Sequence, residues 1–199
     1  MPVPLNYQIS EYDCGPISML NALSVQFSRK QIQPSMIKAV FNYTMDSCDS
    51  KGRSGQKGTS AAALRFIGKW LNEYNQQCGF PVYCKNLHPN DIFLGKDSKL
   101  NIALDNGAVA IVRCLLGTGH YILITKADDT HVYAWDPYHL DNPIRKKTIQ
   151  TITDTPCSHN RRIHFDQMNQ TGRYYYSLGD IEKRECLLIY NTTKSTEMF

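Results

Sequence analysis

The chain has 199 residues, of which 42% are hydrophobic and 20% are charged, and its formal net charge is +4. These proportions are typical of a globular protein, and the length predicts a single domain that spans residues 1–199. Lys and Arg are spread along the chain, and no basic run alternates with aromatic residues, so the sequence does not predict a nucleic-acid partner.

The first residues and the cysteines bear on where the protein works. The start of the chain lacks the basic segment and apolar stretch of a secretory signal, and no run of about 18 apolar residues predicts a membrane span. Seven widely spaced cysteines favour reduced thiols, so we expect a cytoplasmic protein, with export by a non-classical route left open. Cys157, His159 and His164 lie close in sequence, but no C-x-x-C pair accompanies them. We therefore expect no metal and no other cofactor.

Apolar residues recur at helical spacing in the first part of the chain and predict three helices. Asp13 stands where it can cap the first helix, and either Thr59 or Ser60 caps the third. A polar, Gly-rich loop at 44–58 precedes the third helix. It is either a solvated loop, or one that forms a lid or recognises acidic residues of a substrate. Its basic residues are Lys51, Arg53 and Lys57. The predicted helices span residues 14–27, 34–43 and about 60–74.

After Tyr74 the apolar period shortens and predicts strands. The residues at 108–116 are almost all apolar and lie between two glycines, which indicates a strand buried on both faces. Helices that precede antiparallel strands predict an α+β fold, with residues 145–199 extending its sheet. The expected strands are 81–87, 108–116, 120–126, 131–136, 148–153, 161–165, 173–178 and 185–190, and a short helix is expected at 99–106. The tyrosines at 174–176 belong to one of these strands, and Arg161 and Arg162 are expected in solvent.

Cys14 stands where extended chain enters the first predicted helix. Unpaired backbone N–H groups and the positive end of the helix dipole stabilise a thiolate at such a position, and the thiolate is the nucleophilic form of cysteine. The neighbouring Asp13 opposes this effect, so a cationic partner is needed to complete the activation. The alternative interpretation of Cys14 is a small, buried core residue.

A β-hairpin centred on Asp128 supplies such a partner. In that register His120 and Asp136 lie directly opposite each other, with Cβ atoms about 4.5–5.5 Å apart on the same face of the sheet. A carboxylate beside an imidazole holds the ring in one tautomer, and this arrangement activates a cysteine or a serine. A shift of one residue would separate the two side chains. The alternative interpretation is a strand-edge histidine and an aspartate that opens an Asp-Pro turn.

Three segments carry a recognisable pattern: QISEYDCGPISML, GHYILI and WDP. They contain a Gln six residues before the Cys of an Asp-Cys-Gly, a His at the head of a strand and an Asp-Pro soon after. In this pattern the chain resembles the bacteriocin-processing peptidases, which are papain-like domains that remove double-glycine leader peptides and are often fused to ABC exporters. The resemblance covers the first helix and residues 100–137, with no counterpart after residue 145, and the chain carries no exporter.

The resemblance implies a papain-like fold in which Cys14 is the nucleophile, His120 the acid and base, and Asp136 the residue that orients the imidazole. It also implies an oxyanion hole made by the side-chain amide of Gln8 and the backbone N–H of Cys14. We therefore predict a thiol hydrolase that cleaves a peptide or amide bond in a peptide or protein substrate through an acyl-enzyme intermediate. Two alternatives stay open: an acyltransferase that uses the same thioester, and a catalytically inactive module that binds peptides in the cleft.

Overall fold

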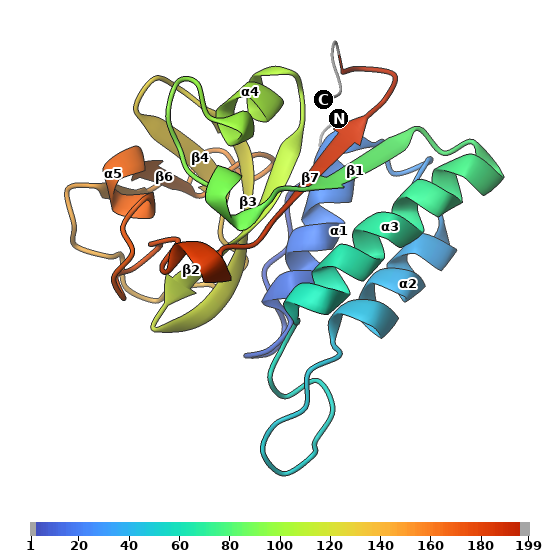
Figure 1. Cartoon of the computed structure of the whole chain (residues 1–199), viewed down its shortest axis with the longest axis horizontal. Helices are drawn as coiled ribbons and strands as arrows, with labels where there is room; N and C mark the ends of the chain where they lie inside the picture. The colour runs from blue at the N-terminus through green and yellow to red at the C-terminus, as the bar shows by residue number, and fades with distance from the viewer. Residues whose placement is uncertain (1–2, 196–199) are drawn as a thin grey trace.

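The computed structural model describes residues 3–195, so the ends of the predicted domain, residues 1–2 and 196–199, lie outside its description. Within residues 3–195 the chain forms an α+β fold built on one antiparallel sheet (Figure 1). Its strands are β1 (Val82–Asn86), β2 (Val109–Leu116), β3 (Thr118–Ala127), β4 (His131–Trp135), β5 (Ile149–Thr151), β6 (Arg161–His164) and β7 (Cys186–Asn191). They lie in the order β1-β7-β2-β3-β4-β6-β5. The segment after residue 145 thus places β5 and β6 at one edge and β7 in the interior of the sheet.

Helices cover both faces of this sheet. The helices are α1 (Cys14–Gln26), α2 (Pro34–Thr44), α3 (Ala61–Cys78), α4 (Lys99–Asp105) and α5 (Phe165–Met168), with 3-10 turns η1 (Pro89–Asp91) and η2 (Ile181–Lys183). In Figure 1, α1, α2 and α3 lie together on one side of the sheet, while α4 and α5 lie on the other. Successive residues of β3 alternate between the two cores, since Ile122 packs on the α4 side and Leu123 on the α1 side. Among the described helices, none combines the length and apolar character that crossing a membrane requires.

Local signals account for the boundaries of α3. The hydroxyl of Ser60 accepts the backbone N–H of Ala63 at 3.1 Å, so Ser60 is the cap. The helix continues past the predicted end near Tyr74 to Cys78 and stops at Gly79, whose φ of 67° lies in the left-handed region that glycine adopts without strain.

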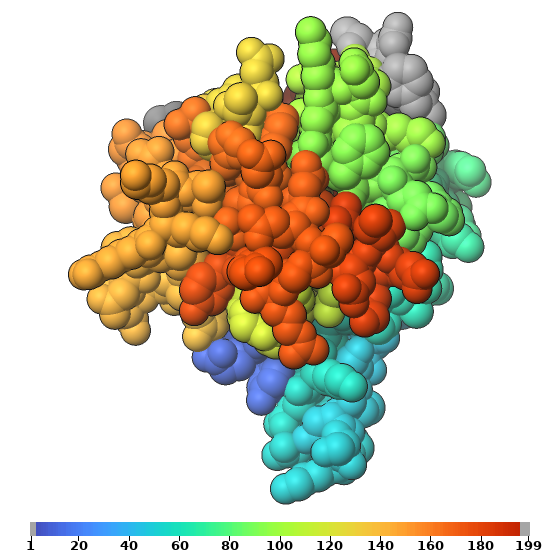
Figure 2. All heavy atoms as spheres, turned by 60° about the vertical axis from the view of Figure 1, so that its left-hand side comes forward, coloured from blue at the N-terminus to red at the C-terminus, as the bar shows by residue number. Residues whose placement is uncertain are grey.

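Residues 45–60 form a loop that projects from the body of the molecule (Figure 2). Asp49 organises the tip of this loop. Its Oδ1 accepts the backbone N–H groups of Lys51 and Arg53, each at 2.9 Å, and its Oδ2 lies 2.6 Å from the Arg53 guanidinium. The positive charge of Arg53 is therefore paired inside the loop, which leaves it less available for an acidic substrate residue.

Two expectations about the strands and their pairing are wrong. Residues 173–178 form turns and no strand, because the chain reverses at Tyr176, whose φ is 61°. The hairpin register also differs from the one centred on Asp128. Leu123 pairs with Trp135 in the inner part of the hairpin, and an irregularity follows between Ile124 and Lys126. Continued inwards, this register places Asp136 one diagonal step from His120, on the same face of the sheet.

Candidate active site

Cys14 is the first residue of α1, and only 8% of it is exposed. Two cavities meet at this residue. One has a volume of about 740 Å³ and also contains Gln8 and His120 in its wall, and the other has a volume of about 800 Å³ and is lined by Tyr121 and Glu185. Among residues 3–195, no acceptor binds the backbone N–H of Cys14, as is usual in the first turn of a helix. The thiol therefore lies between two hollows and beside an unpaired donor.

His120 projects from the start of β3, and its side chain is almost fully buried. Its Nε2 lies 2.7 Å from Oδ1 of Asp136, which leaves Nδ1 for the sulfur of Cys14. Burial alone would lower the pKa of His120. The negative charge of Asp136, the hydrogen bond to it, and the hydrogen bond and charge interaction with Cys14 outweigh burial and raise the pKa to about 10. The ring is thus held as an imidazolium at neutral pH.

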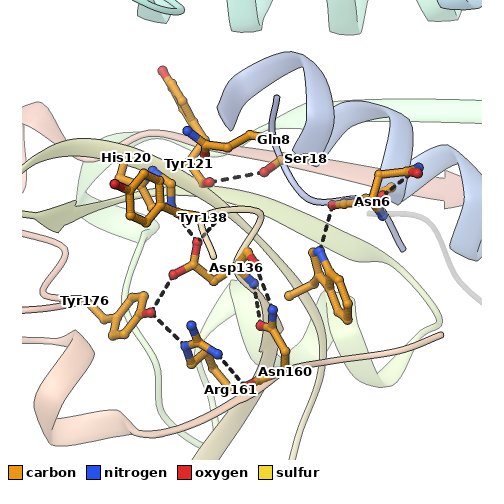
Figure 3. Close-up of polar contacts among 12 residues, drawn as sticks. Asn6, Gln8, Ser18, His120, Tyr121, Asp136, Tyr138, Asn160, Arg161 and Tyr176 are labelled. Carbon is orange, nitrogen blue, oxygen red and sulfur yellow. Dashed lines mark hydrogen bonds and ion pairs between the residues drawn. The ribbon is translucent and has the colours of Figure 1, made fainter. Parts of the chain in front are cut away.

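Asp136 follows β4 directly and is completely buried. Its Oδ1 accepts the backbone N–H of Tyr138 at 2.8 Å as well as the bond from His120, and its Oδ2 accepts the hydroxyl of Tyr176 at 2.5 Å (Figure 3). Burial alone would raise the pKa of Asp136, but the charge of His120 and the hydrogen bonds from His120 and Tyr176 lower it. The backbone of Asp136 is fixed by Asn160, whose side-chain amide makes two bonds of 2.8 Å to it.

Gln8 belongs to the extended N-terminal segment and lines the same cavity as Cys14. Its Nε2 donates to the carbonyl of Ser10 at 2.6 Å, and its Oε1 is buried without a partner among the described residues. The backbone N–H of Gln8 donates to the carbonyl of Pro137 at 2.8 Å, which ties this segment to the residue after Asp136. A side-chain amide has two N–H donors, so one remains beyond the bond to Ser10.

Asp13 folds the loop between Gln8 and Cys14. It is the N-cap residue of α1, but its side chain makes no cap hydrogen bond, contrary to the expectation from the sequence. Instead Oδ2 accepts the N–H of Ile9 at 2.9 Å, and Oδ1 accepts the N–H and the hydroxyl of Ser10 at 2.7 and 2.6 Å. These three donors balance the carboxylate that stands next to Cys14.

Two residues that the sequence did not point to complete the surroundings of Asp136. Arg161 was expected in solvent, but it is only 4% exposed, and its Nε donates to the hydroxyl of Tyr176 at 2.9 Å. Tyr176 was expected on a strand and is fully buried. No local pattern marks either residue, because both act through contacts with residues distant in sequence.

The sequence cluster of Cys157, His159 and His164 does not converge on one point. His164 accepts the N–H of Asp166 at 3.2 Å and so caps α5, while His159 pairs with the hydroxyl of Ser158 at 2.8 Å. Within the part of the chain that the structure describes, no three side chains of the metal-binding types gather closely enough to hold an ion.

The arrangement combines a thiol at a helix start, a buried imidazolium in contact with it, and a carboxylate behind the ring. These are the parts that nucleophilic catalysis by a cysteine requires. Neither a protein-family model nor a curated protein sequence matches this chain, so its function must be inferred from the site itself.

Proposed function

We propose that this chain is a papain-like cysteine hydrolase that cleaves a peptide or amide bond, with Cys14, His120 and Asp136 as its triad. The observation that carries the proposal is the buried His120–Asp136 pair, joined at 2.7 Å, whose ring also contacts Cys14 at the start of α1. A buried cation beside a thiol lowers the energy of the thiolate relative to the thiol, and the helix start acts in the same direction.

The proposed reaction is acyl transfer to water. The Cys14 sulfur attacks the carbonyl carbon, and the carbonyl π electrons move to the oxygen. When the tetrahedral intermediate collapses, the C–N bond breaks and the leaving amine takes a proton from Nδ1 of His120. A water molecule then gives a proton to the same nitrogen and attacks the thioester, so that the C–S bond breaks and the carboxylic acid leaves. Asp136 holds the ring in place and stabilises its charged form throughout.

The oxyanion would be bound by the backbone N–H of Cys14 and the second amide N–H of Gln8. Both residues line the cavity that contains His120, and the contact between Gln8 and Pro137 supports their relative position. Removal of one such donor typically costs about 2.7–4 kcal/mol of transition-state stabilisation.

A peptide or protein is the proposed substrate, because an extended chain fits a cleft that continues on both sides of the nucleophile. The two cavities of about 740 and 800 Å³ meet at Cys14, which suits residues on either side of a scissile bond. The resemblance to bacteriocin-processing peptidases supports this substrate class and a cytoplasmic site of action, where thiols stay reduced.

The same two cavities also favour a second candidate, an acyltransferase. One cavity would hold the acyl group and the other an amine or thiol acceptor in place of water. Trapping the acyl-enzyme in the presence of small amines and identifying the product by mass spectrometry separates the two reactions: the free acid supports hydrolysis, and the amide supports transfer.

The test of catalysis is alkylation by iodoacetamide across a pH series, read at each cysteine by peptide mass spectrometry. The exposed thiols of Cys48 and Cys78 serve as internal references. We expect Cys14 to react faster than both at pH 6, and we expect His120→Ala to remove this preference because the stabilising cation is lost. If Cys14 reacts no faster than Cys48 at pH 6 in the wild type, the chain is not a thiol hydrolase, and the inactive peptide-binding module becomes the better interpretation.

A further inference from the structure

Asp136 is bound from behind by a second pair of side chains, on the side away from His120 (Figure 3). We propose that Tyr176 and Arg161 are positioning residues of the catalytic site, which fix the Asp136 carboxylate towards His120 and balance its charge. This inference rests on the proposed function and extends it, since neither residue belongs to the triad.

The hydrogen bonds form one continuous chain through the buried interior. Arg161 Nε donates to the Tyr176 hydroxyl at 2.9 Å, and this hydroxyl donates to Oδ2 of Asp136 at 2.5 Å. Oδ1 of the same carboxylate meets His120. Because each carboxylate oxygen has its own partner, the carboxylate plane cannot rotate without breaking one of these bonds. The orientation of the imidazole therefore depends on Tyr176 as well as on Asp136.

The backbone of Tyr176 is held in an unfavourable conformation to make this contact. Its φ of 61° is the one positive value for a residue other than glycine among residues 3–195. A bulky side chain in the left-handed region is strained, and such residues concentrate at functional sites. The backbone N–H of Tyr176 donates to the carbonyl of Leu115 at 2.6 Å, which anchors the strained residue to β2.

Burial makes the charge balance around Asp136 important. In the active form a thiolate at Cys14 and the carboxylate of Asp136 would face one imidazolium at His120, which leaves one buried negative charge in excess. Arg161 is only 4% exposed and supplies the missing positive charge. The other titratable groups near Asp136 are Tyr176 and Cys114, and both stay neutral. Burial and the charge of Asp136 raise the pKa of Tyr176. Burial and the charges of Asp136 and Cys14 raise the pKa of the Cys114 thiol.

Both positioning residues come from the part of the chain after residue 145, for which the resemblance gives no counterpart. Arg161 begins β6, and Tyr176 lies in the turns that lead towards η2. The inference therefore gives this part of the chain a role in the catalytic site, beyond the strands that it adds to the sheet.

The test compares Tyr176→Phe with Tyr174→Phe, because both changes remove one hydroxyl and Tyr174 is 53% exposed in the same segment. The carboxyl carbon of Asp136 is followed by ¹³C NMR, and the alkylation rate of Cys14 is followed from pH 4 to 8. Loss of a hydrogen bond to a charged group raises a carboxyl pKa by about one unit. We expect that rise of the Asp136 pKa in Tyr176→Phe, and we expect the acid limb of the alkylation profile to shift to higher pH. Neither change is expected in Tyr174→Phe.

Arg161→Lys provides a second variant, which keeps the charge but loses the planar fork, and Arg162→Lys on the same strand is its control. We expect the acid limb of the alkylation profile to stay closer to its wild-type pH in Arg161→Lys than in Arg161→Gln, because the lysine keeps the buried positive charge. Circular dichroism identifies the pH range in which each variant is folded, and Tyr176→Phe alone decides the matter if the Arg161 variants do not fold.

The outcomes separate this inference from the proposed function. An acid limb that stays in place in Tyr176→Phe overturns the positioning role, whether or not the Asp136 pKa moves, and leaves the proposed function intact. A wild-type Cys14 that reacts no faster than Cys48 overturns the proposed function and this inference together.

Discussion

Replacing Asp136 by Asn removes the buried negative charge beside His120 and keeps the size of the side chain. Opposite charges about 4 Å apart attract by about 4 kcal/mol at an effective dielectric constant of about 20. That energy corresponds to about three pKa units, so the Asp136 charge can outweigh burial, which lowers the pKa of His120, and help to raise it. In Asp136→Asn we expect the pKa of His120 to fall to 6.5 or below, since burial then acts without an opposing carboxylate.

The assay is the pH titration of the His120 imidazole by ¹⁵N NMR, with the His120→Ala spectrum to assign the signal. The Cys14→Ala background removes any contribution of a thiolate, so the difference between the His120 pKa values with and without the Asp136 charge measures the effect of Asp136. We expect His120 in Cys14→Ala to stay protonated at pH 8, and His120 in the double variant with Asp136→Asn to be neutral there.

Equal titration midpoints for His120 with and without the Asp136 charge would refute this reasoning. Such a result would mean that the 2.7 Å contact does not carry an ion pair in solution. The orienting role that we propose for Asp136 would then have to come from hydrogen bonding alone.

Three further predictions concern the stability of the fold. The free energy of unfolding should fall as the pH rises from 6.5 to about 10, because folded His120 keeps a proton that the unfolded chain has lost. Urea denaturation across this pH range measures the fall in the wild type. The Asp136→Asn variant should lack it. Ser60→Ala should cost about 1 kcal/mol through the lost cap of α3, while Ser54→Ala in the exposed loop should change little. Gly15→Ala should lower the free energy of unfolding by about 1–3 kcal/mol, because a Cβ there lies 2.0 Å from the Thr59 hydroxyl. The control is Gly95→Ala, where the nearest atom is 3.9 Å away. Equal stabilities of the two variants would contradict this explanation.

The sequence predicts most of the elements of this fold, because their signals are local. Ser60 marks the start of α3 through its side chain, and the apolar run at 108–116 indicates a strand buried on both faces, which β2 is. The position of β7 between β1 and β2 has no local signal, since it depends on pairing between segments far apart in the chain. The α+β class is thus readable from the sequence, and the strand order is not.

The residues of the candidate site can likewise be predicted only in part from the sequence. Cys14 at a helix start and the proximity of His120 to Asp136 follow from short-range patterns. Tyr176 and Arg161 are brought to Asp136 by the tertiary fold, so residue type and spacing give no indication of their place. The predicted strand at 173–178 was wrong for a related reason: an aromatic run favours a strand, but contacts with distant residues hold Tyr176 in a left-handed conformation.

The irregularity in the β3–β4 hairpin has a consequence for how Asp136 meets His120. Near the turn, Lys126 pairs with Tyr133, and this spacing continued inwards would put Asp136 opposite Leu123, on the other side of the sheet from His120. The ladder skips Thr125, whose hydroxyl donates to the Tyr133 carbonyl at 3.1 Å. Because one residue is skipped, Asp136 and His120 lie on the same face of the sheet. The hairpin thus keeps Asp136 near His120 by leaving one residue out of the ladder. Deletion of Thr125 should therefore remove the irregularity and leave the carboxylate on the same face of the sheet as the imidazole.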